Sequence, residues 1–182
     1  MDFAKSASAG LLAVVACVGP ALLVCSACKK ASDEPFHWVG TGQVQLKMPM
    51  SPCSISTPDG AVQGEIVVGS GTISGQHIGQ DATLISSECA SKTSPYFSGG
   101  LMTITAQNGD AIHINYHGKC GQESPTLLTC QEVDEITGGT GRFADVRGSA
   151  TGDLKAHFTY DSAGNLIMPW SVDLDYTGTG SF

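Results

Sequence analysis

The fold is indicated most clearly by one late stretch, Glu135-Ile136-Thr137-Gly138-Gly139-Thr140-Gly141-Arg142-Phe143-Ala144-Asp145-Val146-Arg147-Gly148. Glycine tolerates positive φ, so the run from Gly138 to Gly141 allows a strand to stop, fold back tightly and restart within a few residues. Phe143 is then the one bulky apolar side chain that the turn can direct inward. We predict a structural turn formed by Gly138, Gly139, Gly141, Arg142 and Phe143.

The composition around this turn favours an all-β fold. The chain has 182 residues, of which 23 are glycine and only 14% are charged. This length suits one domain with a sizeable core, and a chain rich in Gly, Thr and Ser leans towards sheet. The formal net charge is −8, and the nine Lys and Arg residues are scattered. Because no basic patch is present to neutralise phosphates, nucleic acid is not an expected partner.

Alternating apolar and polar residues predict about eight strands joined mainly by short turns. Asn108-Gly109-Asp110 is the strongest hairpin signal, because Asn-Gly fits a turn with positive φ. Gly69-Ser70-Gly71 is expected to bend a strand, and 54–60 to form a loop or a short edge strand. The expected strands cover 36–46, 62–68, 71–74, 77–87, 97–107, 111–118, 131–137, 148–160 and 166–182. Closing them into an antiparallel up-and-down barrel would remove exposed sheet edges.

The block from Gly138 to Gly148 and the ending Tyr176-Thr177-Gly178-Thr179-Gly180 resemble the bacterial branch of the allene oxide cyclase-like barrel proteins. Dirigent and calycin barrels share their shape. The resemblance covers roughly residues 36–182 and implies an all-β, closed up-and-down barrel. Plant allene oxide cyclases steer the cyclisation of an unstable fatty-acid epoxide in a largely apolar cavity. No catalytic residue of those enzymes can be placed on this chain, because the strands that carry them do not match.

The first 27 residues are expected to be a signal peptide. Lys5 provides a thin positive region, and 11–24 is an apolar run too short to span a bilayer comfortably. Ser26 and Ala27 place small residues directly before Cys28, which resembles the lipobox of bacterial lipoproteins, although Cys25 stands where Leu or Val is usual. Cys28 is therefore the expected lipidated N-terminus. Ordinary cleavage near Ala27, which gives a secreted or periplasmic protein, is the alternative.

The segment 28–35 is expected to be the lipidated cysteine and a short polar tether, and 36–182 a single barrel domain. Lys29 follows Cys28 in place of the Asp that favours inner-membrane retention in Gram-negative lipoproteins. We therefore expect a protein of the bacterial cell envelope, anchored to the outer membrane through Cys28.

Four further cysteines lie in the expected domain, an even number that favours disulfides in an exported chain. Of three connectivities we favour Cys120 with Cys130 and Cys53 with Cys89, because 121–125 forms a turn that brings the first pair together. The spacing lacks paired C-x-x-C ligands, so zinc is the weaker interpretation. No metal and no cofactor is expected.

Glu135 is the one candidate catalytic residue, within the acidic group of Glu132, Asp134 and Glu135. Strand alternation sends Glu132 and Asp134 to one side and Glu135 to the other, together with Val133. If Val133 faces the lumen, Glu135 lies near the mouth, where desolvation would raise its pKa and suit it to acid or base catalysis. A solvated rim carboxylate is the simpler interpretation.

Other polar groups suggest less chemistry. His113 and His117 share a strand face but lie too far apart for one metal, roughly 13 Å at strand spacing, and with His157 they fit a polar outer face. The glycine turn could form an anion nest beside Arg142, but it lacks the Gly-Lys-Ser/Thr ending that phosphate binding needs.

The sequence thus favours an exported, membrane-tethered barrel without evident catalytic machinery that binds a small apolar ligand or a surface partner. A barrel tightly filled by side chains, with no internal cavity, would exclude the small-ligand function and leave a surface adaptor or structural role. The alternative is a cyclase- or isomerase-like enzyme, or a dirigent-like protein, that uses the barrel lumen.

Overall fold

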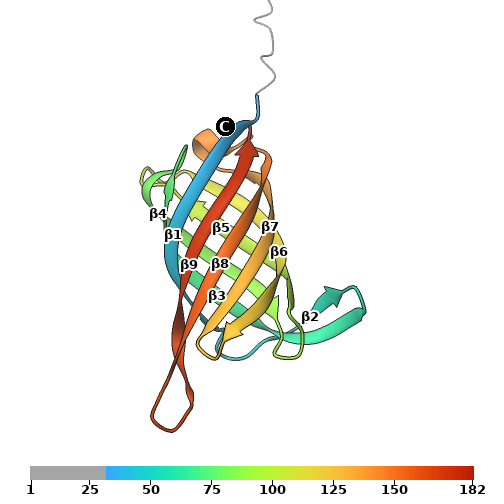
Figure 1. The fold of residues 1–182 in the computed structure, drawn as a ribbon. Coiled ribbons are helices and arrows are strands. Elements are labelled where there is room, and N and C mark those ends of the chain that lie inside the picture. The colour runs from blue at the N-terminus through green and yellow to red at the C-terminus, as the bar shows by residue number, and fades with distance from the viewer. Residues whose placement is uncertain (1–31) are drawn as a thin grey trace, which may run out of the picture. The chain divides into compact units, whose positions relative to one another are not determined.

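A meander of antiparallel strands makes up residues 32–182, the part of the chain that this computed structural model describes (Figure 1). The chain runs through β1 (Glu34–Leu46), β2 (Pro52–Thr57), β3 (Gly60–Gly75), β4 (Gly79–Ala90), β5 (Tyr96–Thr105), β6 (Ala111–Ser124), β7 (Leu127–Gly139), the 3-10 turn η1 (Gly141–Phe143), β8 (Gly148–Tyr160) and β9 (Leu166–Gly180). The expected signal peptide and Cys28 lie outside the described residues.

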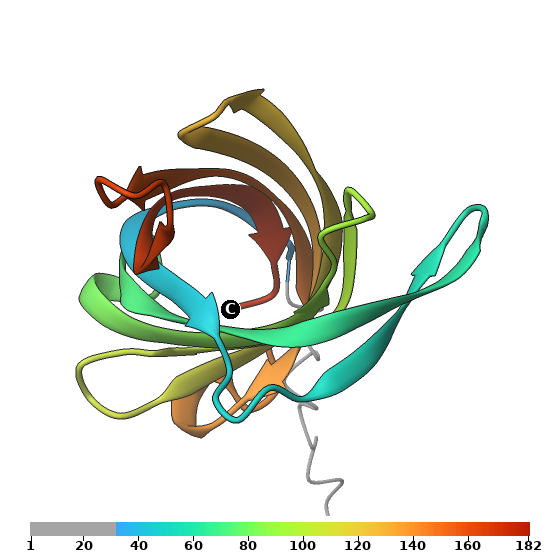
Figure 2. The same cartoon turned by 90° about the horizontal axis from the view of Figure 1, so that it is seen from below.

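The sheet closes into a barrel of eight strands, as the sequence predicted. Its order is β1-β9-β8-β7-β6-β5-β4-β3-β2, and an additional pairing of β1 with β3 joins the two sides. This seam runs from Trp38 opposite Gly75 to Leu46 opposite Val67. β2 pairs with β3 in a hairpin that extends away from the cylinder (Figure 2).

The paired glycines at the seam serve close approach. β3 runs through Gly69-Ser70-Gly71 with unbroken register against both β1 and β4, so no bulge lies there. A Cβ on Gly71 would overlap the carbonyl oxygen of Thr41, and one on Gly40 would overlap that of Thr72. The small residues therefore let β1 and β3 pack tightly where the barrel closes.

Several strands also exceed their expected ranges. β1 begins at Glu34, two residues into the expected tether, because it pairs with the end of β9 at Gly180. Residues 52–57 form β2 because β3 offers them a partner. β6 continues past residue 118, and β7 starts before residue 131. In this added part of the two strands Cys120 lies directly opposite Cys130.

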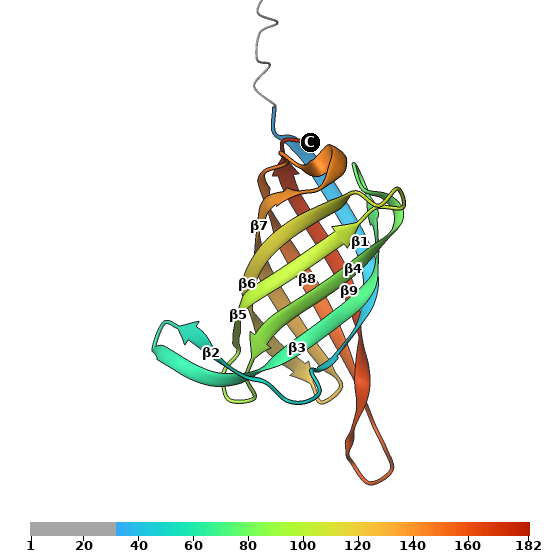
Figure 3. The ribbon, with the colours of Figure 1, turned by 180° about the vertical axis from the view of Figure 1, so that it is seen from behind.

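The two ends of the barrel differ. The η1 end holds η1, the start of β1 and the end of β9, and the hairpin end holds β2 and the projecting β8–β9 hairpin (Figures 1 and 3). Aromatic rings fill the η1 end: Phe36 stacks on Trp38 with centroids 4.0 Å apart, and Phe182 contacts both edge-on. Phe143, which is 2% exposed, completes this plug. These rings therefore close the η1 end of the lumen.

The glycine turn closes the η1 end. Gly138 and Gly141 have φ of 133° and 57°, which favour glycine. A Cβ on Gly141 would collide with the carboxylate of Asp110. Arg142 donates to the carbonyl of His77 at 2.9 Å and lies 4.6 Å from the Phe143 ring centroid. These contacts hold Arg142 against the backbone of His77 and the ring of Phe143.

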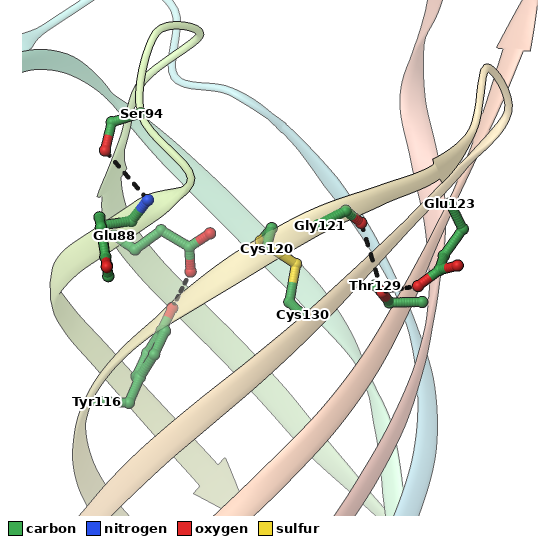
Figure 4. The surroundings of a disulfide bond; sticks show 9 residues. Glu88, Ser94, Tyr116, Cys120, Gly121, Glu123, Thr129 and Cys130 are labelled. Atoms are coloured by element: carbon green, nitrogen blue, oxygen red, sulfur yellow. Dashed lines mark hydrogen bonds between the residues drawn. A yellow bond between two sulfur atoms is a disulfide. The ribbon is translucent and has the colours of Figure 1, made fainter.

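Two disulfides stabilise the hairpin end, in the pairing that the sequence favoured. Cys53 on β2 is bonded to Cys89 on β4, and Cys120 on β6 to Cys130 on β7 (Figure 4). Such bonds are typical of extracellular or periplasmic proteins. Between residues 32 and 182 no helix has the length and apolarity to cross a bilayer.

Candidate functional site in the barrel lumen

Two acidic side chains of β7 point into the barrel. Glu132 is 3% exposed and Asp134 2% exposed, whereas Val133 is 52% exposed and Glu135 lies on the outer surface. Val133 does not face the lumen, so the condition for a catalytic Glu135 is not met, and the exposed Glu135 fits the simpler interpretation of a solvated carboxylate. The expected alternation along β7 is present, but its inward positions are Glu132 and Asp134 and not Glu135. The buried Ile136 shares this inward face with them.

Each of two tyrosines donates a hydrogen bond to a lumen carboxyl group. The Tyr116 hydroxyl on β6 donates to Oε2 of Glu88 on β4 at 2.5 Å (Figure 4). The Tyr176 hydroxyl on β9 donates to Oε2 of Glu132 at 3.0 Å. Four strands therefore bring these groups together, and burial raises the pKa of both tyrosines, so both hydroxyls remain protonated donors.

Glycines on neighbouring strands make room for the tyrosine rings. A Cβ on Gly100 would lie 2.6 Å from ring carbons of Tyr116, and one on Gly152 would lie 2.5 Å from the ring of Tyr176. Each ring therefore lies against bare backbone of the adjacent strand. This packing fixes the position of each hydroxyl at the carboxyl group that it meets.

A small cavity adjoins these pairs. Its volume is about 50 Å³, and its polar lining includes Glu88, Tyr116, Glu132 and Tyr176. This volume exceeds what one water molecule occupies but is far below the roughly 300–1,000 Å³ of pockets for drug-sized ligands. The lumen is thus nearly filled in this conformation, and the open space that remains lies beside its acidic groups.

Asp134 has no partner for either carboxylate oxygen, although both are buried. Within 32–182, the ion pairs of the structure involve other acidic residues, and none reaches Glu88, Glu132 or Asp134. Burying a carboxylate without a partner is unfavourable, because the lost hydration is not replaced. The lumen therefore contains three carboxyl groups and no compensating cation.

Burial shifts the protonation of these acids. Desolvation raises the pKa of Asp134 to about 7. Desolvation also raises the pKa of Glu132 well above its ordinary range, and the nearby charges of Asp134 and Glu88 add to this effect. The pKa of Glu88 is raised by burial, with partial opposition from the Tyr116 hydrogen bond. These groups interact and titrate as a cluster, which near neutral pH carries protons that exposed carboxylates would have lost.

The outer face carries the remaining polar candidates. A groove of about 790 Å³ crosses the outside of β6 to β9, and another of about 480 Å³ crosses β5 to β7. In the first groove Oδ2 of Asp173 lies 2.9 Å from Nε2 of His157. Oδ1 of Asp175 lies 2.7 Å from Nε2 of His37. His113 and His117 are exposed. We consider the lumen the better candidate, because the charged groups of the outer groove are exposed to solvent and two of them, Asp173 and Asp175, already have partners.

The sequence analysis missed most of the lumen cluster. Tyr116 and Tyr176 had been placed on the apolar faces of their strands, which correctly indicates an inward direction. Glu132, Asp134 and Ile136 lie at alternate positions of β7 and therefore share one face of the strand. Glu88 had no local signal, because its strand was expected to end at 87.

Within the described residues no cluster of three or more His, Cys, Asp or Glu side chains has the geometry to hold a metal ion. The polar side chains described above in the lumen are carboxyl and phenol groups, which can donate and accept hydrogen bonds.

Comparisons with known proteins give a structural neighbour but no family. No family model and no curated protein matches the sequence. Among solved structures, that of the pterocarpan synthase dirigent protein GePTS1 is similar at 16% sequence identity and a TM-score of 0.42, over 83% of this chain and 87% of that chain. This likeness concerns the barrel-shaped path of the chain and assigns no activity to it.

Proposed function

We propose that this protein is an exported β-barrel, anchored to the cell envelope through Cys28, which binds a small and largely apolar molecule in its lumen. The lipobox-like sequence before Cys28 supports the anchor. The two disulfides support folding in an oxidising compartment. The barrel then serves as a soluble container held at a membrane surface.

The buried Asp134 on the inner face of β7, which has no hydrogen-bond partner, is the observation that carries the binding function. A protein that needed only stability would gain by an apolar residue there, because Asp134 buries two oxygens without a hydrogen bond. Buried groups with strongly shifted pKa values concentrate at functional sites. A guest with a polar group would supply the missing interaction.

The hairpin end offers the route into the lumen. Below the acidic groups the interior is lined by apolar side chains, including Val44, Leu154 and Val172. Phe158 and Trp170 meet edge-on there with ring centroids 5.6 Å apart, and both are only partly buried. The cavity has room for little more than a polar head group. The apolar part of a guest therefore lies among these side chains, which move aside to admit it.

A lumen enzyme of dirigent-like or cyclase- and isomerase-like type is the alternative, and the raised pKa values favour it specifically. A carboxyl group that keeps its proton near neutral pH is a general acid. Glu132 and Asp134 take the place of Glu135 in this hypothesis, with Tyr176 holding Glu132 in position. Glu132→Gln would then abolish turnover while leaving guest binding intact.

Methyl-resolved NMR with 1-hexanol as an apolar probe tests lumen binding. Saturable shifts are expected at the inward methyl groups of Val44, Leu154 and Val172. Leu101 and Val133, which are exposed on the outer face, serve as internal controls. Shifts confined to the outer face would favour a surface partner, and an absence of saturable shifts would contradict the proposal.

A further inference from the structure

We propose that Asn108 is a modification site: the folded β5–β6 turn protects its side-chain amide from deamidation, and deamidation in an opened turn keeps the η1 end of the barrel from closing again. This inference is independent of lumen binding. It follows from the sequence Asn108-Gly109, from the hydrogen bonds of the turn and from the contacts of Asp110 with η1.

The sequence of the turn favours an attack of the backbone on the amide. Asn108 is exposed, and the next residue, Gly109, has no side chain to shield its backbone nitrogen. In deamidation this nitrogen forms a bond to Cγ of Asn108, the Cγ–Nδ2 bond breaks, and ammonia leaves with the proton of the backbone nitrogen. Water then opens the cyclic imide to aspartate or isoaspartate. The other two asparagines, Asn115 and Asn165, precede bulky residues.

The folded turn holds both reacting groups away from this reaction. The N–H of Gly109 donates to the carbonyl of Ala106 at 2.9 Å, so the attacking nitrogen keeps its proton. Oδ1 of Asn108 accepts from the backbone N–H of Asp110 at 3.2 Å, and Nδ2 donates to Oδ2 of Asp110 at 2.7 Å. The side-chain amide is thus held by Asp110, and the turn must open before Gly109 reaches it.

The same amide belongs to a chain of contacts that joins the β5–β6 turn, η1 and the β3–β4 turn. Oδ2 of Asp110, which accepts from Asn108, lies 3.9 Å from Nε of Arg142. Arg142 donates to the carbonyl of His77, and the His77 ring stacks on that of Phe182 with centroids 4.0 Å apart. A change at Asn108 therefore acts on the contacts that close the η1 end.

Deamidation replaces the donor in this chain by a second carboxylate. The hydrogen bond from Nδ2 of Asn108 to Asp110 is lost, and two negative charges then face each other across the turn. Asp110 has little room to withdraw, because its carboxylate occupies the space of a Cβ on Gly141. Isoaspartate would also insert the side-chain methylene into the main chain of the turn. Refolding reverses neither change, so the loss of closure is permanent.

Peptide mapping of the disulfide-bonded protein tests the protection. The protein is kept at pH 8.5 and 37 °C with and without guanidinium chloride, and deamidation is followed by mass spectrometry of the tryptic peptide 93–119. This peptide contains both Asn108 and Asn115 and no cysteine. We expect Asn108 to lose its amide at least about tenfold faster in the unfolded protein, because the reaction is confined to the open turn. Asn115 should keep its amide in both samples.

Matched variants test the consequence. Asp110→Ala removes the acceptor that holds the Asn108 side chain and should speed deamidation in the folded protein. Asn108→Asp reproduces the carboxylate of the product and should lower the melting temperature and speed amide hydrogen exchange at 76–78 and 140–143. Gln107→Glu adds an equal charge at the neighbouring exposed position and should do neither. The deamidated fraction of the native protein, separated by ion exchange, serves as a second sample.

Each outcome decides one part of the inference. Equal deamidation of Asn108 in the folded and unfolded protein would overturn protection by the turn, and equal deamidation of Asn108 and Asn115 in the unfolded chain would overturn the choice of site. Hydrogen exchange that is the same in Asn108→Asp, the deamidated fraction and the native protein would overturn the effect on closure. Deamidation that requires opening, together with a looser η1 end in its product, supports the inference.

Discussion

Replacing Asp134 by Asn should make the free energy of unfolding of the protein less sensitive to rising pH. The folded chain keeps a proton on Asp134 up to a pKa of about 7, while the unfolded chain releases it near 3.8. The folded state therefore binds more protons between these values, and the free energy of unfolding falls as the pH rises through this window. At about 1.4 kcal/mol per pH unit, ionisation of this group removes on the order of 4 kcal/mol by pH 7. Asn does not ionise in this pH range, so the free energy of unfolding of the variant does not fall in this way.

Urea unfolding at several pH values, followed by the fluorescence of Trp38 and Trp170, measures the effect. The stability advantage of Asp134→Asn over the native protein should grow by about 2.5 kcal/mol between pH 5 and pH 8. Glu135→Gln on the outer face should show no such trend. An advantage that stays constant with pH, or a native protein that becomes more stable as the pH rises from 5 to 7, would refute the assignment of a buried, unpartnered carboxyl group.

Three further predictions concern the ends of the barrel. Phe143→Ala should lower the free energy of unfolding by about 3–5 kcal/mol in denaturant titrations, because it removes a buried ring from the plug at the η1 end; a loss below 1 kcal/mol would show that the plug is dispensable. Gly141→Ala should destabilise by more than the roughly 1 kcal/mol of a strained turn residue, since its Cβ would also meet Asp110, and an unchanged melting temperature would contradict this. Opening the Cys120–Cys130 bond by substituting both residues with Ser should cost about 3 kcal/mol, the loop-closure term for a separation of 10 residues, and equal stability of the variant and the oxidised protein would show that the bond contributes nothing.

Much of the barrel was predictable because its signals are local. Asn108-Gly109 and the alternation on either side of it predicted the β5–β6 hairpin, which the structure contains with Gly109 at φ 89°. The glycine-rich block predicted a tight return with a buried Phe143, since few other residues tolerate positive φ. The turn at 121–125 also favoured the bond between Cys120 and Cys130, which leaves Cys53 to pair with Cys89, and the structure contains both bonds.

The functional site was less predictable because it depends on long-range register. Glu88 and Tyr116 lie 28 residues apart, and Glu132 and Tyr176 lie 44 apart. Nothing in a single strand shows that these side chains meet. The phase of β7 depended on whether Val133 or Ile136 faces the lumen, and hydrophobicity alone does not distinguish them. Pairing with β6 and β8 decides it, and a shift of one residue exchanges Glu135 for Asp134.

The seam illustrates a second limit. Gly69 and Gly71 suggested a bend, because glycine in a strand is compatible with both bending and close approach. Only the partner strand shows which applies, and β1 brings its own Gly40 and Gly42 to the same contact.

Native mass spectrometry of the protein isolated from its own cell envelope tests the central claim most directly. The account predicts a mature chain that begins at Cys28 with added acyl mass and retains a small molecule, released when the barrel unfolds. A chain without acyl mass, free of any small molecule and unable to take up added 1-hexanol, would contradict it.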